Sequence, residues 1–177
     1  EVMGTADKHD AKLEAMKELL RPVFESGEKA IVFTQFAEMA EILIRSIPAV
    51  KVWCIQGSVA SEDRQEYVRE FTAQEGAGVM VMTEAGAYGL NLQAATCVIH
   101  YDLPWSVAKL VQREDRAHRI GQTKPVTVYS LIAKNTVDEY IVKVLHAKSK
   151  YSMDILKDAD RIEAAAVSQE DVDKLLE

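Results

Sequence analysis

Three arginines recur at intervals of three residues in the segment QREDRAHRIGQ, residues 112–122. Together with the glutamine before them, they are Gln112, Arg113, Arg116 and Arg119. If residues 106–119 form one helix, Gln112, Arg116 and Arg119 share a face, because positions i, i+4 and i+7 align. Guanidinium groups keep their charge and donate bidentate hydrogen bonds to phosphate oxygens. The segment therefore predicts a site for the terminal phosphate of a nucleotide.

A surface helix with internal ion pairs is the alternative interpretation of the same residues. Asp115 and Arg119, like Glu114 and His118, are four residues apart and would meet on a helix. Arg113 fits this interpretation best, because it lies off the shared face. The sequence alone leaves both interpretations open.

The charge of the chain is unevenly distributed. Its 177 residues have a formal net charge of -7, yet residues 105–150 carry nine Lys and Arg against four Asp and Glu. A local basic zone of this kind can meet phosphate groups despite an acidic average. No apolar run reaches the length of a membrane span, and the first ten residues are unlike a signal peptide. We therefore expect an intracellular protein with no membrane partner.

The potential metal ligands of the chain do not form a recognisable metal motif. Cys54 and Cys97 each lie in an apolar, strand-like run, where a lone cysteine is usually a core residue. His100 and His118 are interpreted as structural residues, since neither belongs to a pattern of metal ligands. The prediction is that no metal ion is bound.

Apolar strands alternate with helices along the chain. Helices are predicted within 8–26 and over 38–47, 61–71, 106–119 and 136–156, and strands over 29–34, 50–55, 78–83, 95–102 and 126–132. We expect Pro22 to end or kink the first helix, and Thr136 with Glu139 to form a capping box on the last one. Continuous Val and Ile runs between helices are typical of a parallel sheet covered on both faces. The fold class is therefore α/β, with a mostly parallel sheet.

One domain accounts for most of the chain. The expected domain covers residues 1–157, with an N-terminal helix at 8–26, the sheet and its cover helices at 30–132, and a C-terminal helix at 136–157. The remaining residues, 158–177, are acidic and rich in alanine, and we expect them to form a helical tail.

The chain lacks the motifs of a complete ATP site. Nucleotide hydrolases of the P-loop type need GxxxxGK[ST] and an acidic ligand for magnesium, and neither pattern occurs in these 177 residues. The arginines of segment 112–122 could, however, act in trans on a nucleotide that another domain holds.

Five motifs in order closely resemble the second RecA-like lobe of superfamily two helicases, specifically the Swi/Snf-type DNA-dependent ATPases. The resemblance runs from about residue 12 to about residue 156. Its motifs are KAIVFTQF, IQGSVASEDRQEYVREF, TEAGAYGLNLQAATCVIHYDLPW, QREDRAHRIGQ and VTVYSLIAKNTVDEYIVKVL. The resemblance implies a RecA-like three-layer domain. Two departures are Glu84, where many members have a basic residue, and WSVAK, which replaces the usual Trp-Asn-Pro.

The resemblance also implies roles for individual residues. Arg116 and Arg119 would be arginine fingers that reach the γ-phosphate, and Gln112 would contact the same region or orient them. Gly89 and Asn91 would line the nucleotide cleft. Contacts to the DNA backbone would come from residues after three strands, which are Thr34, Gln35, Gly57, Ser58 and Thr83. Trp105 would be either a coupling residue between motifs or a hydrophobic anchor.

The function implied is that of the second motor lobe of an ATP-dependent translocase or remodeller of double-stranded DNA. Its partners would be duplex DNA and the N-terminal RecA-like lobe of the same protein. ATP and Mg²⁺ would be held mainly by that first lobe, so this lobe alone should bind neither and should not hydrolyse ATP. The alternatives are a lobe of an RNA- or single-strand-directed helicase, and a non-catalytic nucleic-acid-binding adaptor. The compact chain favours a bacterial, archaeal or viral protein in the cytoplasm over a nuclear one.

Overall fold

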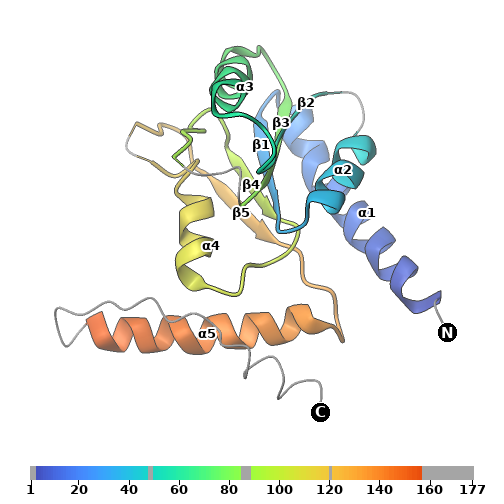
Figure 1. The fold of residues 1–177 in the computed structure, drawn as a ribbon, viewed down its shortest axis with the longest axis vertical. Coiled ribbons are helices and arrows are strands. Elements are labelled where there is room, and N and C mark those ends of the chain that lie inside the picture. The colour runs from blue at the N-terminus through green and yellow to red at the C-terminus, as the bar shows by residue number, and fades with distance from the viewer. Residues whose placement is uncertain (1–2, 48–49, 85–88, 120, 157–177) are drawn as a thin grey trace.

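The computed structural model of the chain describes residues 3–47, 50–84, 89–119 and 121–156. Its elements follow one another as α1 (Met3–Glu25), β1 (Lys29–Thr34), α2 (Ala37–Ser46), β2 (Lys51–Ile55), α3 (Ser61–Ala73), β3 (Gly78–Thr83), β4 (Cys97–His100), α4 (Val107–Glu114), β5 (Thr127–Ser130) and α5 (Val137–Leu156). The five strands form one sheet in the order β2-β3-β1-β4-β5, and every neighbouring pair is parallel (Figure 1). The predicted α/β class and sheet are confirmed.

Helices cover both faces of this sheet and bury its central strands. On one face, Met16 and Leu20 of α1 pack with Leu43 of α2 against alternate strand residues. On the other face, Phe71 of α3 packs with the intervening strand residues, among them Phe33. Because both sides of β1 and β3 are covered, their sequences are continuously apolar rather than alternating. This is the expected arrangement of three layers.

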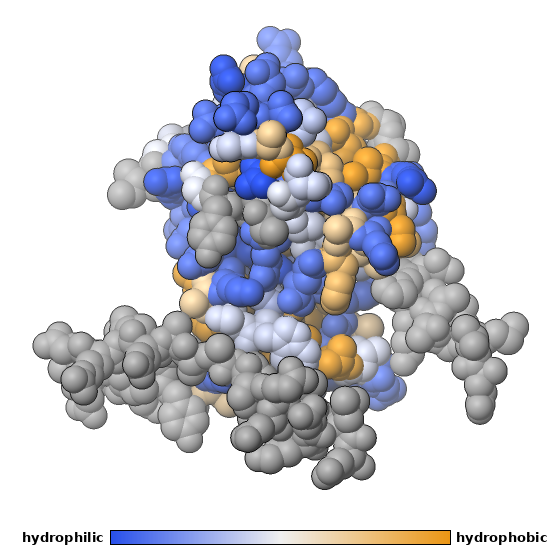
Figure 2. Space-filling view, viewed as in Figure 1, coloured by the Kyte–Doolittle hydropathy of each residue, from blue (hydrophilic) through white to orange (hydrophobic). Residues whose placement is uncertain are grey.

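Polar and apolar surfaces follow this layering. The sequence of α3 is rich in charged residues, and Figure 2 shows hydrophilic side chains covering the end of the molecule that carries it. Helix α5 runs below α4 in the view of Figure 1. Ile141 and Leu145 of α5 form a small apolar cluster with Leu103, and Val107 and Leu110 of α4 pack against it.

Local details of three helices differ from the predictions. Pro22 does not end α1, which continues to Glu25, because a proline in the last turn loses only one helical hydrogen bond; the kink that was its alternative stays a prediction. At α5, the amide of Asp138 rather than that of Glu139 donates to the Thr136 hydroxyl, so no capping box is seen. Helix α4 ends at Glu114, five residues before the predicted end.

The early end of α4 has a tertiary cause. The methyl group of Ala117 is fully buried against the sheet, in the same cluster as Phe71. In addition, the carbonyl of Arg116 accepts a hydrogen bond from the amide of Leu92 at 2.9 Å. Both contacts hold residues 116 and 117 on a path of turns that follows the end of α4 at Glu114. The predicted helical face shared by Gln112, Arg116 and Arg119 is therefore incorrect.

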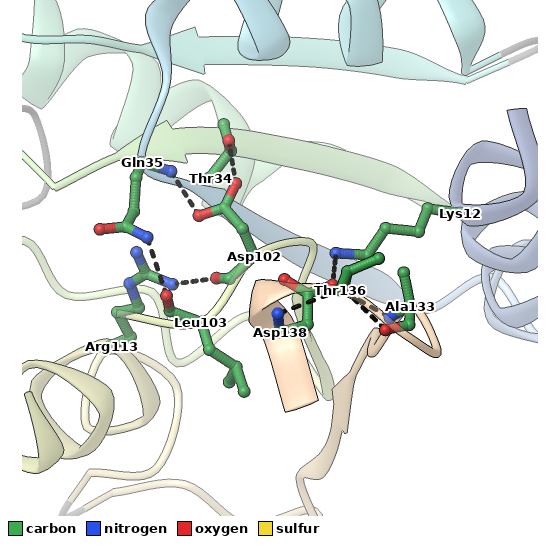
Figure 3. Close-up of polar contacts among 9 residues, drawn as sticks. All are labelled: Lys12, Thr34, Gln35, Asp102, Leu103, Arg113, Ala133, Thr136 and Asp138. Carbon is green, nitrogen blue, oxygen red and sulfur yellow. Dashed lines mark hydrogen bonds and ion pairs between the residues drawn. The ribbon is translucent and has the colours of Figure 1, made fainter. Parts of the chain in front are cut away.

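A partly buried ion pair joins the two ends of the fold. Lys12 of α1 and Asp138 of α5 are 126 positions apart, and their charged atoms lie 2.6 Å from each other (Figure 3). Asp138 also accepts a hydrogen bond from the amide of Ala133 at 3.0 Å. One carboxylate thus fixes the start of α5 against α1. The proposed tail at 158–177 lies outside the described residues.

Candidate functional site

The segment that follows α4 carries two of the predicted arginines, and we call residues 115–122 the arginine segment. It packs on residues 91–95 of the loop between β3 and β4. Besides the bond between Leu92 and Arg116, the side-chain amide of Gln122 donates to the carbonyls of Gln93 at 2.9 Å and Ala95 at 3.1 Å. The backbone of the arginine segment is therefore anchored at both ends.

The side chains of Arg116 and Arg119 form no hydrogen bond or ion pair with any residue that the structure describes. Arg116 is half-buried, and its Nε is buried with no hydrogen-bond partner among the described residues. Arg119 is exposed, and neither arginine forms an ion pair within the part of the chain that the structure describes. Asp115 in particular does not pair with Arg119. The alternative of a surface helix with internal ion pairs is thus not observed at these two arginines.

The residues predicted to line the nucleotide cleft lie next to the arginine segment. Asn91 is exposed, and its side chain contacts that of Gln93 at 3.3 Å. Because Leu92, its neighbour, bonds to Arg116, Asn91 and Arg116 come from segments that touch. Gly89 is also exposed and has a φ of 72°, a left-handed conformation that favours glycine. Residues 85–88 between β3 and Gly89 lie outside the described residues.

The last predicted nucleotide-site residue, Gln112, occupies the final turn of α4 and is exposed. It precedes the arginine segment rather than sharing a helical face with it. The structure therefore brings the segment of Asn91 into contact with that of Arg116, with Gly89 two positions before Asn91, and leaves Gln112 at the border of this site. The roles of these residues toward a nucleotide remain predictions.

The carboxyl ends of the strands hold the residues predicted to contact DNA. Thr34 at the end of β1 is paired in register with Thr83 at the end of β3. Both threonines are buried, with 0% and 5% of their surface exposed, so neither hydroxyl lies on the surface. Gly57 and Ser58, which follow β2, are exposed. Of these four residues, only the glycine and the serine lie on the surface, and contact of any of them with DNA remains a prediction.

Asp102, which the sequence analysis did not identify as a site residue, organises the strand ends next to β4. Its carboxylate accepts hydrogen bonds from the hydroxyl of Thr34 and from the amide of Gln35, the latter at 2.7 Å (Figure 3). The side chain of Gln35 donates in turn to the carbonyl of Leu103 at 2.8 Å. Burial raises the pKa of Asp102, while the bonds from Thr34 and Gln35 oppose that shift. Thr34 and Gln35 are therefore committed to internal hydrogen bonds.

Arg113 has a different environment from the one predicted. Its side chain is 3% exposed, pairs with Glu84 at 2.9 Å and donates to the carbonyl of Asp102 at 2.8 Å. The guanidinium also lies over the ring of Phe33, 5.4 Å from its centre. A second cation, Lys109, pairs with the other oxygen of Glu84 at 2.7 Å. Arg113 is thus part of the buried structure and not of a solvated surface.

A histidine supports α4 at the position next to Arg113. His100 ends β4, is fully buried, and has its Nε2 3.4 Å from a carboxylate oxygen of Glu114. Burial, assisted by the charge of Arg113, lowers the pKa of His100 to about 3. The imidazole is therefore neutral near pH 7, so its contact with Glu114 is not an ion pair. Its ring stacks on that of Phe33, with centres 5.9 Å apart.

Trp105 is half-buried and packs against the apolar cluster between α4 and α5. This is the position of a hydrophobic anchor, and a coupling role for Trp105 remains a prediction. Within the described ranges, no group of three or more His, Cys, Asp and Glu side chains could hold a metal ion. None of the helices there is long and apolar enough to cross a lipid bilayer.

Comparison with known proteins identifies the family. The model of the helicase conserved C-terminal domain matches residues 11–121, which include the strand ends and most of the arginine segment. The chain belongs to this family. Its relatives confirm the resemblance to Swi/Snf-type ATPases, and one of them has a crystal structure with a similar fold. That structure, the C-terminal part of the Fun30 ATPase domain, has a TM-score of 0.76 and 26% identity, covering 93% of this chain and 51% of that one.

Relatives of this helicase C-terminal domain come from several kinds of organism. The ATP-dependent helicase fft2 of Schizosaccharomyces pombe is 37% identical over 83% of the chain, and Protein CHROMATIN REMODELING 19 of Arabidopsis thaliana is 38% identical over 84%. The putative ATP-dependent helicase/translocase YwqA of Bacillus subtilis is 34% identical over 82%. The chain spans only 12%, 20% and 16% of these proteins. Because yeast and plant proteins are among them, the expectation of a cytoplasmic rather than nuclear protein has no support.

Proposed function

We propose that this domain is the second motor lobe of an ATP-dependent translocase or remodeller of double-stranded DNA. In this role, Arg116 and Arg119 contact the terminal phosphate of ATP that is held on the first lobe. The observation that carries the proposal is the arginine segment itself. Its backbone is bonded to residues 91–95, while its two guanidiniums have no anionic partner among the described residues.

A pre-positioned arginine has a clear physical role in phosphoryl transfer. Charge develops on the phosphoryl oxygens in the transition state, and a bidentate guanidinium stabilises it without any reorganisation of water. Holding the backbone of Arg116 through Leu92 limits the positions that the guanidinium can adopt. Arginine fingers of this kind contribute about a thousandfold or more to the rate.

The described residues fit the phosphate of a nucleotide but not its metal ion. Arg116 and Arg119 offer cationic donors, and Asn91 adds an exposed amide beside them. The described residues contain no group of three or more His, Cys, Asp and Glu side chains that could hold a metal ion. ATP bound at the interface would supply the phosphoanhydride, with Mg²⁺ held by the first lobe. This lobe would then provide charge stabilisation and would be inactive alone.

Double-stranded DNA is proposed as the track on two grounds. Exposed Gly57 and Ser58 after β2 offer small donors that suit phosphate oxygens and carry no sequence information. Among the relatives, one is named for chromatin remodeling and one as a helicase/translocase, which supports a motor that acts on duplex DNA. An RNA-directed helicase and a non-catalytic adaptor are the alternatives that the experiment below and DNA-binding assays distinguish.

The decisive experiment measures ATP hydrolysis by the two-lobe protein after substitution of Arg119. Arg119→Ala should lower the rate by about a thousandfold, and Arg119→Lys should restore little, because a point charge cannot replace the planar fork. The melting temperature should hardly change, since Arg119 is exposed and has no partner in the described structure. Arg45→Ala is the matched control: Arg45 is an exposed arginine on α2 whose pair with Glu41 spans 3.7 Å.

Near-normal hydrolysis by Arg119→Ala, with a normal melting temperature, would refute the arginine-finger role. The buried Arg113 cannot serve as the control here, because its loss removes internal hydrogen bonds.

A further inference from the structure

Arg113 is a buried cation that the motor function described above does not use. The Arg113 residue is only 3% exposed. Burying a charged group costs free energy unless the charge is paired and hydrogen-bonded. Its ion pair with Glu84 and its hydrogen bond to the carbonyl of Asp102 satisfy both terminal nitrogens, while its Nε is buried with no hydrogen-bond partner among the described residues. The arrangement is specific as well as stable, because only a planar guanidinium can reach two acceptors in different segments while stacking on Phe33.

The partners of Arg113 lie at the ends of three adjacent strands. Glu84 follows the last residue of β3, Phe33 is next to last in β1, and Asp102 comes two residues after β4. Asp102 in turn binds the hydroxyl of Thr34 and the amide of Gln35, as Figure 3 shows. The proposed DNA contacts, Gly57 and Ser58, follow β2, which pairs with β3. The ends of β3, β1 and β4 therefore connect that contact to one side chain of α4.

The same side chain stands directly before the arginine segment. Arg113 is in the last turn of α4, and its carbonyl accepts a hydrogen bond from the amide of Arg116 at 3.3 Å. Glu114, the next residue, contacts His100 at the end of β4. The last turn of α4 is thus bonded to the strand ends by Arg113, and Glu114 adds a contact that is neither an ion pair nor a hydrogen bond. The arginine segment begins directly after these two residues. A shift of the strand ends would be passed to Arg116 through the backbone.

We infer that Arg113 is a positioning residue that links DNA binding at the strand ends to the placement of Arg116 and Arg119. The inference rests on the proposed function and adds the route by which DNA stimulates hydrolysis. Misplacing a catalytic group by about 1 Å can cost about a hundredfold in rate, so even a small shift through Arg113 is sufficient for control.

The test compares three variants of the two-lobe protein in steady-state ATP hydrolysis with and without duplex DNA. Arg113→Met keeps the apolar stem over Phe33 but removes both polar contacts, while Glu84 retains Lys109 as a partner. Glu84→Gln removes only the charge of the pair. Lys109→Met is the matched control, because Lys109 also binds Glu84 but is exposed and does not contact Asp102 in the described structure.

With Arg113→Met, DNA-stimulated kcat should fall about tenfold more than the DNA-free rate, a typical size for coupling between sites. Glu84→Gln should also lower the ratio of the DNA-stimulated rate to the DNA-free rate, and Lys109→Met should leave this ratio unchanged. A merely structural role would lower both rates equally, and that result, or an unchanged ratio with Arg113→Met, overturns the inference. If Arg113→Met fails to fold in thermal melting, Glu84→Gln against Lys109→Met decides in the same way.

Arg119→Ala, measured in parallel, separates this inference from the proposed function. Loss of both rates with Arg119→Ala, together with an unchanged ratio for Arg113→Met, overturns only the role of Arg113. Full activity of Arg119→Ala overturns the arginine-finger function and, with it, the link that Arg113 is inferred to make.

Discussion

The amide of Leu92 donates a hydrogen bond to the carbonyl of Arg116 at 2.9 Å, and this contact joins two motifs that lie 24 positions apart in the chain. It ends the regular path of α4 and holds the arginine segment on the loop that follows β3. Gln122 adds side-chain bonds to the carbonyls of Gln93 and Ala95 from the same loop. The candidate nucleotide site is therefore built from two loops that support each other.

Gly121 gives a first test of this support. Its φ is 104°, and a Cβ there would lie 3.3 Å from the side-chain nitrogen of Gln93. Gly121→Ala should cost about 1–2 kcal/mol of unfolding free energy, from backbone strain together with that contact. It should also lower ATP hydrolysis by the two-lobe protein, because the arginine segment must shift.

Gly76→Ala is the control for Gly121→Ala, since Gly76 has a similar φ of 77° but no atom near the added methyl group. It should cost about 1 kcal/mol and leave hydrolysis unchanged. Equal hydrolysis by the two variants would show that the arginine segment tolerates displacement.

The pH dependence of stability should report on His100. Its pKa falls from 6.5 to about 3 on folding, so between these values the unfolded chain binds a proton that the native chain does not. The stability that this difference provides is complete above pH 6.5 and is lost as the pH falls. At pH 5 the loss amounts to about 2 kcal/mol.

His100→Leu should remove that part of the acid sensitivity, which urea unfolding at pH 7 and pH 5 measures directly. Burial raises the pKa of Glu114 and of Asp102. Protonation of these two carboxyl groups at low pH therefore stabilises the folded state, whereas protonation of His100 destabilises it. Both carboxyl groups remain in the variant, so the comparison isolates the imidazole. An identical pH dependence of the two proteins would mean that His100 keeps an ordinary pKa.

The ion pair between Lys12 and Asp138 should be important for stability. Asp138→Ala leaves Lys12 and the amide of Ala133 without their partner, so it should cost about 3 kcal/mol in urea unfolding. Asp138→Asn should cost less, because an amide oxygen can still accept from Ala133.

Glu14→Ala is the matched control for Asp138→Ala, since it breaks an exposed ion pair with Lys17 on the same α1 helix. The loss of such a pair should cost at most about 0.5 kcal/mol. Similar costs for Asp138→Ala and Glu14→Ala would argue that α1 and α5 are held together by apolar packing instead.

The order of the elements and the family were predictable from the sequence of this protein. Continuous apolar runs such as residues 78–83 are local signals of strands covered on both faces, and they led to the α/β class. The motifs around Gly89, Asn91, Arg116 and Arg119 likewise identified the candidate site, because they depend on residue types and short spacings. These features need only a few neighbouring residues to be recognised.

Only the tertiary structure decided where α4 ends and which arginine is buried. Helical spacing predicted that residues 106–119 would continue as one helix and that Arg113 would face solvent. Packing of Ala117 on the sheet and the bond from Leu92 ended the helix at Glu114, while Glu84 and Asp102 drew Arg113 inside. These partners lie 11 to 29 positions away in the chain, a distance that no helical period connects. Long-range hydrogen bonds and burial outweighed the local preference of residues 115–119 for a helix, which amounts to only about 0.5 kcal/mol per residue.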